Sequence, residues 1–530
     1  MATRLAPHAG GAERRLAVID MGSNTFRLVV FRYRPGGSFQ LVDEIRHAVR
    51  LSAGAGPEGL HPDALERAGH AANLYRAFCD AAGVDDVAAV TTSAVRDGAN
   101  RTEALAALSV DGGLDVRVLS AEEEAWYGYL GAVNSTTLTD GHVLDLGGGS
   151  VQVSQVTGRR LGEVVSRPLG AVRMTERFLA EEKPGRADIR ALRRHVAREL
   201  EDLDWLAGAG GRMVGIGGTI RTLASMHQRS VRYPLMGELH GYPLPLSGID
   251  DLVEAMAALP ASERSRLPGL KQDRADITLA GAIVIGTILE RAGVEAIEIC
   301  SQGLREGLFY ERFLSPADPP LIPDIRRQSV MNLVDTYRCD IPHVEHVCAL
   351  ALAIYDELAR LGLHAADASE REMLWAAGML HDAGVLVDYN DHHKHGYYLV
   401  LNAGLPGFAH HELAMIALLV RGHRKGLPTL SPLEDILRRR AARSPERPAD
   451  GDEGTLRRLA ACLRIAEQLE RGRARGIRSV HMSATKAALK LDVTAIGDPS
   501  VALWSAALES PVVQRAFGRR LELGVAFPAA

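Results

Sequence analysis

Apolar runs broken by short polar turns predict the first elements of this chain. Residues 17–31 (AVIDMGSNTFRLVVF) predict an apolar strand, a polar turn and a returning apolar strand, and residues 142–156 (HVLDLGGGSVQVSQV) repeat the pattern. In each copy, Asp, one apolar residue and Gly stand where the first strand gives way to the turn. Because such a repeat indicates duplication, we expect two α/β subdomains that each open with a hairpin.

The rest of the N-terminal half alternates helical and strand patterns. Apolar residues at helical spacing predict helices, whereas short apolar runs predict strands. The expected helices are 63–82, 100–108, 121–133 and 275–292, the expected strands are 87–91, 115–119 and 296–300, and a strand, turn and helix are expected at 213–224. This order of elements is typical of an α/β fold.

A proline-rich segment divides the chain. Residues 315–324 (SPADPPLIPD) contain four prolines and are interpreted as a linker. After it the periodicity is helical to about residue 480, and the tail predicts a strand at 487–493 and a last helix at 508–521. Residues 438–454 predict a long mobile loop. The expected domains are two α/β subdomains, a helical domain and a small α+β cap, at 15–134, 135–314, 320–480 and 481–530.

The charge balance argues against one class of function. The net charge is -5, from 61 Lys and Arg against 66 Asp and Glu, whereas a protein that coats nucleic acid carries a positive excess. The five cysteines are scattered, so neither a disulfide framework nor a zinc ribbon is expected. The N-terminus lacks the apolar region of a signal peptide, and the apolar stretch 279–290 is too short to span a bilayer. We therefore expect a soluble cytoplasmic protein that binds neither membrane nor nucleic acid.

Three turns rich in Gly and Ser predict a phosphate site. Such turns leave backbone N–H groups free to point at phosphate oxygens, because no Cβ blocks a close approach. Asp20 and Asp145 each end a strand just before such a turn, where a carboxylate can hold a hydrated Mg²⁺ beside phosphate. One turn of this kind is often only structural, whereas two in a repeat favour function. The turn residues are Ser23 and Asn24, then Gly147, Gly148, Gly149 and Ser150, and finally Gly217, Gly218 and Thr219.

Six motifs follow one another through the N-terminal half. They are IDMGSNTFRL (19–28), TTSAVRDGAN (91–100), LSAEEEAWYGYLG (119–131), LDLGGGSVQ (144–152), VGIGGTIRTLA (214–224) and QGLREG (302–307). Together they resemble the exopolyphosphatase/guanosine pentaphosphate phosphohydrolase family, a branch of the actin-like ATPase superfamily. The resemblance implies duplicated ribonuclease-H-like (actin-like) subdomains closing over a cleft, hydrolysis of phosphoanhydrides that depends on Mg²⁺ or Mn²⁺, and a homodimer.

The resemblance also implies roles for individual residues. Glu124, in an acidic run that begins a helix, matches the catalytic base, whereas Glu122 and Glu123 are interpreted as favouring the helix dipole. Arg96, which follows Ser93 in a Ser-Ala-x-Arg loop, matches a contact to substrate phosphate. A solvated surface side chain is the alternative interpretation of Arg96.

Gln152 departs from the pattern of that family, which carries a second essential Glu at this position. An amide can orient water but cannot take a proton or carry charge. Either Glu124 acts as the base without a second acid, or turnover is weak, or the protein binds without cutting. We expect an exopolyphosphatase, with Glu124, Asp145 and Gln152 in the catalytic site. The alternatives are hydrolysis of guanosine pentaphosphate and a non-catalytic polyphosphate or nucleotide sensor.

Histidines and acids recur in the helical half. His343 begins an apolar helix, His381 and Asp382 end another, and Glu467 lies in a third. This spacing resembles the HD superfamily of metal-dependent phosphohydrolases, although Glu467 stands where that superfamily has Asp. The resemblance implies a second metal at these residues, whereas each His alone is interpreted as a core or surface residue. Further histidines in this half are His395, His410, His411 and His423.

Basic runs concentrate positive charge in the helical half, at 421–425, 438–440 and 471–475. They are interpreted either as solvated faces or as the lining of a channel for a long phosphate chain.

Overall fold

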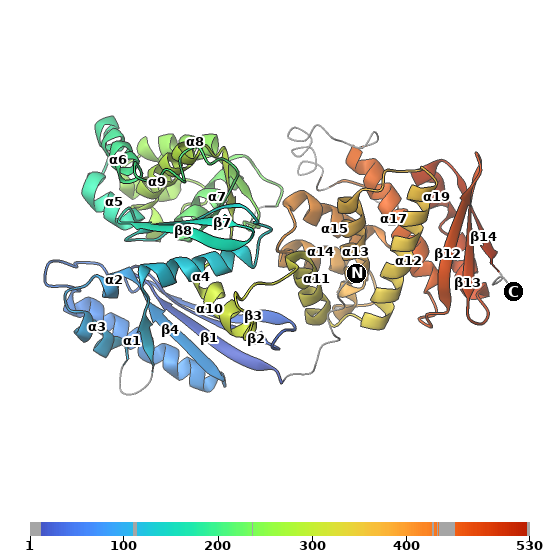
Figure 1. Cartoon of the computed structure of the whole chain (residues 1–530), viewed down its shortest axis with the longest axis horizontal. Coiled ribbons are helices and arrows are strands. Elements are labelled where there is room, and N and C mark those ends of the chain that lie inside the picture. The colour runs from blue at the N-terminus through green and yellow to red at the C-terminus, as the bar shows by residue number, and fades with distance from the viewer. Residues whose placement is uncertain are drawn as a thin grey trace. The chain divides into compact units, whose positions relative to one another are not determined.

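The computed structural model describes residues 12–109, 114–235, 237–426, 429–431, 433 and 451–526. The chain divides into two compact units, the first ending at Ile325 and the second beginning at Arg326 (Figure 1). Among the described residues, no helix combines the length and the apolar character needed to cross a membrane.

The first unit begins with a five-stranded sheet in the order β3-β2-β1-β4-β5. β1 and β2 form an antiparallel hairpin, and β4 pairs with β1 in parallel. The strands are β1 Arg14–Met21, β2 Phe26–Tyr33, β3 Phe39–His47, β4 Asp86–Thr91 and β5 Val116–Val118. The helices are α1 Pro62–Ala81, α2 Ser93–Arg96, α3 Arg101–Leu108 and α4 Ala121–Val133.

A six-stranded sheet follows in the order β10-β11-β9-β6-β7-β8. It repeats the opening hairpin, since β6 and β7 are antiparallel and β9 pairs with β6 in parallel. The strands are β6 Gly141–Leu146, β7 Val151–Thr157, β8 Arg160–Arg167, β9 Arg212–Ile216, β10 Pro243–Pro245 and β11 Ala296–Ile299. The helices are α5 Ala171–Phe178, α6 Arg186–Glu199, α7 Gly218–Ser230, α8 Leu246–Ala257, α9 Thr278–Ala292 and α10 Leu304–Phe313, with 3-10 helices η2 Ala261–Arg266 and η3 Gln272–Arg274.

Helices α4 and α10 join the two sheets through one core, and Figure 1 shows α4 between them. Side chains of β1, β6, α4 and α10 belong to the same buried cluster. Gly131 and Gly307 permit this approach, because a Cβ at either would overlap the backbone of Gly303 or Tyr127. α10 thus returns the chain to the first sheet, while the expected limits 15–134 and 135–314 stay a prediction.

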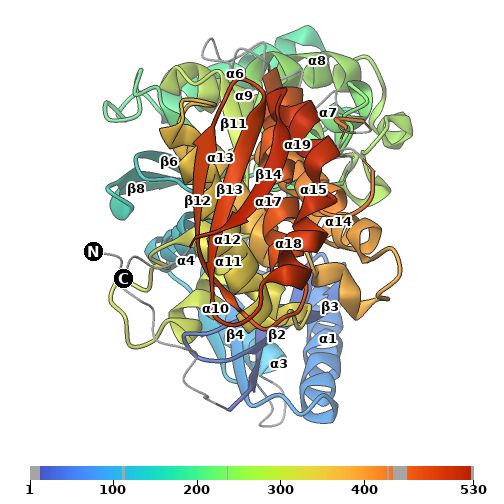
Figure 2. The same ribbon diagram turned by 90° about the vertical axis from the view of Figure 1, so that its right-hand side faces the viewer.

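The second unit is helical, followed by a three-stranded sheet in the order β12-β13-β14 (Figure 2). β13 pairs with β12 antiparallel and with β14 parallel. The helices are α11 Ile325–Thr336, which spans the boundary between the units, α12 Ile341–Arg360, α13 Ala368–Leu380, η4 Ala383–Leu386, α14 His392–Ala403, α15 His410–Gly422, α17 Gly451–Leu469, α18 Ser500–Ala507 and α19 Ser510–Phe517. The strands are β12 Ile477–Ala484, β13 Ala488–Ala495 and β14 Arg520–Val525.

Two local predictions for this unit were wrong. The last helix, expected at 508–521, extends only over Ser510–Phe517, because Gly518 turns left-handed at φ 68° and the following residues form β14. Residues 451–454, expected in a loop, form the first turn of α17, while 438–450 lie outside the described residues. The fold class itself is confirmed: two α/β subdomains that each open with a hairpin, then a helical domain and a small α+β cap.

Candidate functional site

Both hairpins direct their turns into one cavity of about 200 Å³ in the first unit. Asp20 and Asp145 each occupy the next-to-last position of a strand, opposite Arg27 and Gln152 in the hairpin register. The third turn, before α7, lies at the same cavity because Gly217 adopts φ 104° there. The cavity gathers these predicted residues: Asp20, Ser23, Asn24, Ser93, Glu124, Asp145, Gly147, Gly148, Ser150, Gly217 and Gly218.

Four carboxylates line this cavity, those of Asp20, Glu124, Asp145 and Glu306, and they repel one another. Burial raises the pKa of Asp20 and of Glu124. Burial, together with the charges of Glu124 and Asp20, raises the pKa of Asp145 to about 7. Closely spaced carboxylates with raised pKa values are stabilised in their ionised form by a cation. Oxygen donors of this kind are the ligands that Mg²⁺ prefers, so the residues fit the expected metal.

Arginines also line the cavity, and the sequence interpretation did not single them out. Burial and the neighbouring Arg305 and Arg221 lower the pKa of Arg27 to about 10. The pKa of Arg221 is lowered by burial and by Arg305, and that of Arg274 by burial and by Arg46. Mutual repulsion of buried guanidinium groups is relieved by an anion. The cavity therefore combines a place for a cation with a place for a polyanion.

Three of these arginines lie within motifs, where the sequence carried a signal for them, and Arg305 is the one in QGLREG (302–307). Arg27 faces Asp20 across the first hairpin, and Arg221 lies one helical turn after Gly218 in α7. Arg274 packs directly on that turn, because a Cβ at Gly218 would overlap its guanidinium group. No local pattern marks Arg274, since only the tertiary fold brings it to the cavity.

The start of α4 positions Glu124. The Ser120 side chain accepts the backbone N–H of Glu123 at 3.2 Å, and the Glu123 carboxylate accepts that of Ser120 at 2.8 Å. Glu122 accepts the Ser120 hydroxyl at 2.7 Å. Glu122 and Glu123 thus serve the helix start, and Glu124 on the next position reaches the cavity.

Some predicted residues lie beside the cavity. The Arg96 guanidinium Nη1 donates to Glu124 Oε2 at 2.9 Å, so it binds the predicted base. Gly149 lines a neighbouring cavity, and Thr219 is buried in α7. Whether Arg96 contacts phosphate stays a prediction.

Gln152 acts on the cavity through Ser150. Its side chain is 2% exposed, and Nε2 donates to Ser150 Oγ at 3.0 Å. Because a carboxylate at position 152 would lie buried near Asp145 without a cation, we expect Gln152→Glu to leave kcat unraised and to lower the melting temperature in the absence of Mg²⁺. Steady-state phosphate release and thermal melts measure both, and a higher kcat would contradict this.

The raised pKa of Asp145 makes stability depend on pH. Between the usual value of 3.8 and about 7, the folded protein holds a proton that the unfolded chain has lost. Stability therefore falls as pH rises through this window, and Mg²⁺ on the ionised carboxylates restores it. We expect Mg²⁺ to raise the melting temperature more at about pH 8 than at about pH 6. Asp145→Asn is the control. If Mg²⁺ raised the melting temperature of that variant by the same extra amount at about pH 8, the pH dependence would not come from Asp145.

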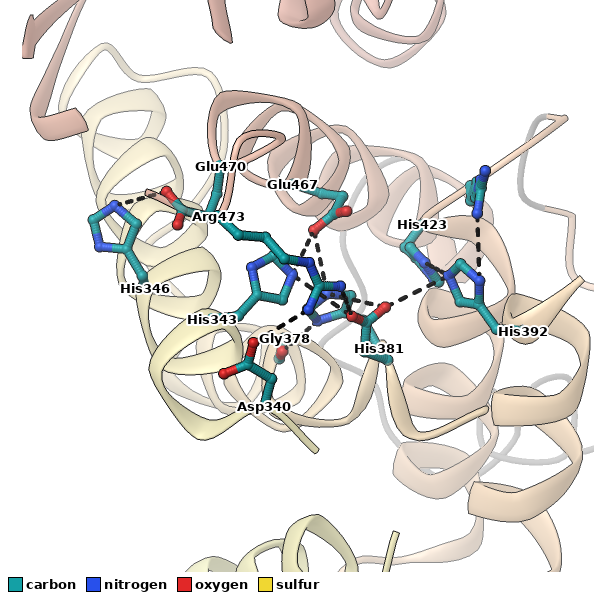
Figure 3. A network of polar contacts seen from close by, with 12 residues as sticks. Asp340, His343, His346, Gly378, His381, His392, His423, Glu467, Glu470 and Arg473 are labelled. Carbon is teal, nitrogen blue, oxygen red and sulfur yellow. Dashed lines mark hydrogen bonds and ion pairs between the residues drawn. The ribbon is translucent and has the colours of Figure 1, made fainter. Parts of the chain in front are cut away.

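A second cluster lies in the helical unit (Figure 3). His343 Nε2 is 3.6 Å from Asp382 Oδ2, and His381 Nε2 is 3.6 Å from Asp382 Oδ1. Both Nε2 atoms approach Glu467 Oε2, at 3.3 and 3.2 Å. The four predicted metal residues therefore converge, and three of them, His343, His381 and Asp382, offer ligand atoms within 4.8 Å of one another.

His392, which the sequence interpretation missed, extends this cluster together with His423. His392 Nε2 lies 3.5 Å from Asp382 Oδ1 and 3.0 Å from His423 Nε2. Asp382, His392 and His423 form a second potential ligand group, whereas His395, His410 and His411 belong to neither group among the described residues.

Backbone carbonyls fix the orientation of three rings. Nδ1 of His381, His392 and His423 lies 2.7, 2.8 and 2.6 Å from a carbonyl three residues earlier, so Nδ1 carries the proton. The Nε2 atoms then point inward: those of His392 and His423 face each other (Figure 3), and that of His381 approaches Asp382 Oδ1. This orientation is the one that metal-binding histidines adopt.

Comparison with known proteins gives two matches that together span most of the chain. Residues 29–315 match the Ppx/GppA phosphatase family, and residues 325–498 match Ppx/GppA phosphatase, domain III. A solved Ppx/GppA enzyme of Aquifex aeolicus is 29% identical, with 56% of this chain and 99% of that chain covered and a TM-score of 0.50. An exopolyphosphatase of Cytophaga hutchinsonii is 25% identical, with 57% and 98% covered and a TM-score of 0.52.

Proposed function

Because this chain belongs to the Ppx/GppA phosphatase family, as its motifs predicted, we propose that it is an exopolyphosphatase, which releases terminal orthophosphate from inorganic polyphosphate. One observation carries the proposal: a single cavity is lined by four carboxylates, those of Asp20, Glu124, Asp145 and Glu306, and by four arginines, Arg27, Arg221, Arg274 and Arg305. A metal ion and a chain of phosphates together neutralise both sets.

The hairpin turns and Glu124 perform the chemistry. Backbone N–H groups of the turns at Ser23 and Gly148 hold the terminal phosphate. The Glu124 carboxylate takes a proton from the attacking water, and its raised pKa strengthens it as a base. Asp20 and Asp145 would hold Mg²⁺ or Mn²⁺, which supplies positive charge beside the phosphate oxygens when bound.

The arginines favour a long polyanion. A terminal phosphate needs few charged contacts, whereas further arginines extend the positive region to Arg274, which packs against Gly218. Guanosine pentaphosphate, the alternative substrate, would place fewer phosphates along them. The position of a carboxylate base at the cavity favours hydrolysis over a sensor that only binds.

A phosphate-release assay tests the proposal. We expect release from long-chain polyphosphate that requires Mg²⁺ or Mn²⁺ and exceeds release from guanosine pentaphosphate at equal concentration of ends. Arg274→Ala should raise KM for polyphosphate by about tenfold, since a guanidinium contact to an anion contributes roughly 1.5 kcal/mol. Arg266→Ala, whose side chain is 74% exposed, is the matched control. Binding of polyphosphate without release would favour the sensor.

We also propose that the helical unit binds a metal of its own. With Nδ1–H of His392 and His423 donated to the backbone, two Nε2 lone pairs face each other at 3.0 Å. Burial lowers the pKa of His423, which keeps that ring neutral. The buried Nε2 atoms of His343 and His381 lie 3.3 and 3.2 Å from Glu467 Oε2, so these three atoms converge on one point. Imidazole and carboxylate donors in this arrangement suit a first-row transition metal.

Metal analysis of the purified protein tests this second site. Asp382 is the one residue common to both ligand groups. Because losing even a residue that only supports a ligand weakens metal binding about tenfold or more, Asp382→Asn should lower metal affinity by at least about tenfold. Asp356→Asn, on the exposed side of α12, is the control. Equal metal content in wild type and Asp382→Asn would contradict the site.

A further inference from the structure

A second cavity of about 670 Å³ adjoins the phosphate cavity. Ser23, Ser93 and Gly148 line both cavities, so these residues form the partition between them. The Ser23 and Ser93 hydroxyl oxygens lie 3.4 Å apart across it. The partition therefore consists of small side chains and backbone.

The two cavities differ in charge. Arginines line the phosphate cavity, whereas Arg173 is the cation that lines the second cavity, against Asp97 and Glu176, within the part of the chain that the structure describes. The Arg173 Nε atom already donates to the Gly149 carbonyl at 3.1 Å. The arginines of the first cavity therefore favour a long polyanion, whereas the second, with two carboxylates against one cation, does not retain an anion that passes through it.

The charged groups along the cleft follow an order. Glu124 bonds Arg96, which also contacts Asp97 at 3.3 Å, and Asp97 lines the second cavity. The charges that act on Glu124 are those of Arg96, Asp20 and Asp97. Those of Arg305 and Arg27 act instead on Asp20. The predicted base is thus connected through Arg96 to Asp97 at the second cavity, whereas the four arginines line the first cavity and not the second.

In-line hydrolysis moves the product in a defined direction. Water attacks the terminal phosphorus from the side of Glu124, its proton passes to the carboxylate, and the bond to the bridging oxygen breaks on the side of the arginines. The bridging oxygen leaves with the shortened chain, and inversion carries the phosphorus toward the attacking oxygen. Orthophosphate is therefore formed next to the Ser23–Ser93 partition.

We propose that orthophosphate leaves through the second cavity, past Ser23 and Ser93, while the shortened chain stays on the arginines. The inference rests on the proposed hydrolysis of a phosphate chain. It separates the path of the product from that of the substrate, so the chain need not dissociate before the next cut.

Narrowing the second cavity tests this exit. Ala99 and Ala55 both line it and both are exposed, so Ala99→Phe and Ala55→Phe avoid the protein core. Ala106→Phe, exposed on α3 and outside both cavities, is the matched control. Rapid quenching measures cleaved phosphate, and a fluorescent phosphate sensor measures released phosphate, with long-chain polyphosphate as the substrate.

We expect the two variants to cleave about one phosphate per site in a burst and then to release it at least about fivefold more slowly than the control, with KM for polyphosphate not raised. If the two variants cleave and release phosphate at the same rate as the control, the inference is overturned while the proposed function stands. The inference would also be overturned if cleavage and release slowed equally in these variants and no burst of cleaved phosphate were seen. A wild type that cleaves neither polyphosphate nor guanosine pentaphosphate would instead overturn the proposed function and the exit with it.

Discussion

Glu124→Gln is expected to lower kcat by at least about a hundredfold, because an amide cannot take the proton of the attacking water. The carboxylate is held at the cavity by the start of α4 and by Arg96, so the amide should occupy the same place. Substrate binding should survive, since the arginines and the hairpin turns remain. Phosphate release measures kcat, and retention of labelled polyphosphate measures binding.

Glu122→Gln provides the matched control for this variant. Glu122 lies two residues earlier, bonds the Ser120 hydroxyl and does not line the cavity. Its replacement should leave kcat close to that of the wild type. Full activity of the Glu124 variant, or an equal loss in both, would assign the base elsewhere.

Asp145→Asn should raise the Mg²⁺ concentration for half-maximal activity and lower the maximal rate, each by at least about tenfold. Burial and the neighbouring Glu124 and Asp20 destabilise the ionised Asp145 carboxylate. A bound cation relieves this repulsion, so loss of the carboxylate should weaken Mg²⁺ binding. Magnesium titrations of phosphate release measure both quantities.

Asp20 holds the position in the first hairpin that Asp145 holds in the second, so its variant gives the comparison. Asp20→Asn should act in the same direction, because both residues end the first strand of a hairpin at the same cavity. Asp140→Asn, whose carboxylate only accepts the Gly158 backbone N–H at 2.9 Å, should leave the titration unchanged. An unchanged magnesium titration in Asp145→Asn would show that Asp145 does not bind the metal and has only a structural role at the end of β6.

The sequence by itself determined the elements whose signals are local. The two hairpins are marked by apolar strands around an Asp-x-Gly turn, and the start of α4 by the acidic run Glu122, Glu123 and Glu124. The six motifs identified the family. The sequence did not mark β12, because residues 477–484 carry a weak apolar pattern and follow a long helical region.

Only the tertiary structure decided which charges meet. Arg27, Arg221, Arg274 and Arg305 come from β2, α7, η3 and α10, and the fold of both sheets places them in one cavity. His392 joined Asp382 for a similar reason, since its ring direction follows from the carbonyl of Tyr389 and the packing of α14. Local patterns set strands, turns and helix starts through interactions between near neighbours. The convergence of distant side chains depends on packing between elements, which no local pattern contains.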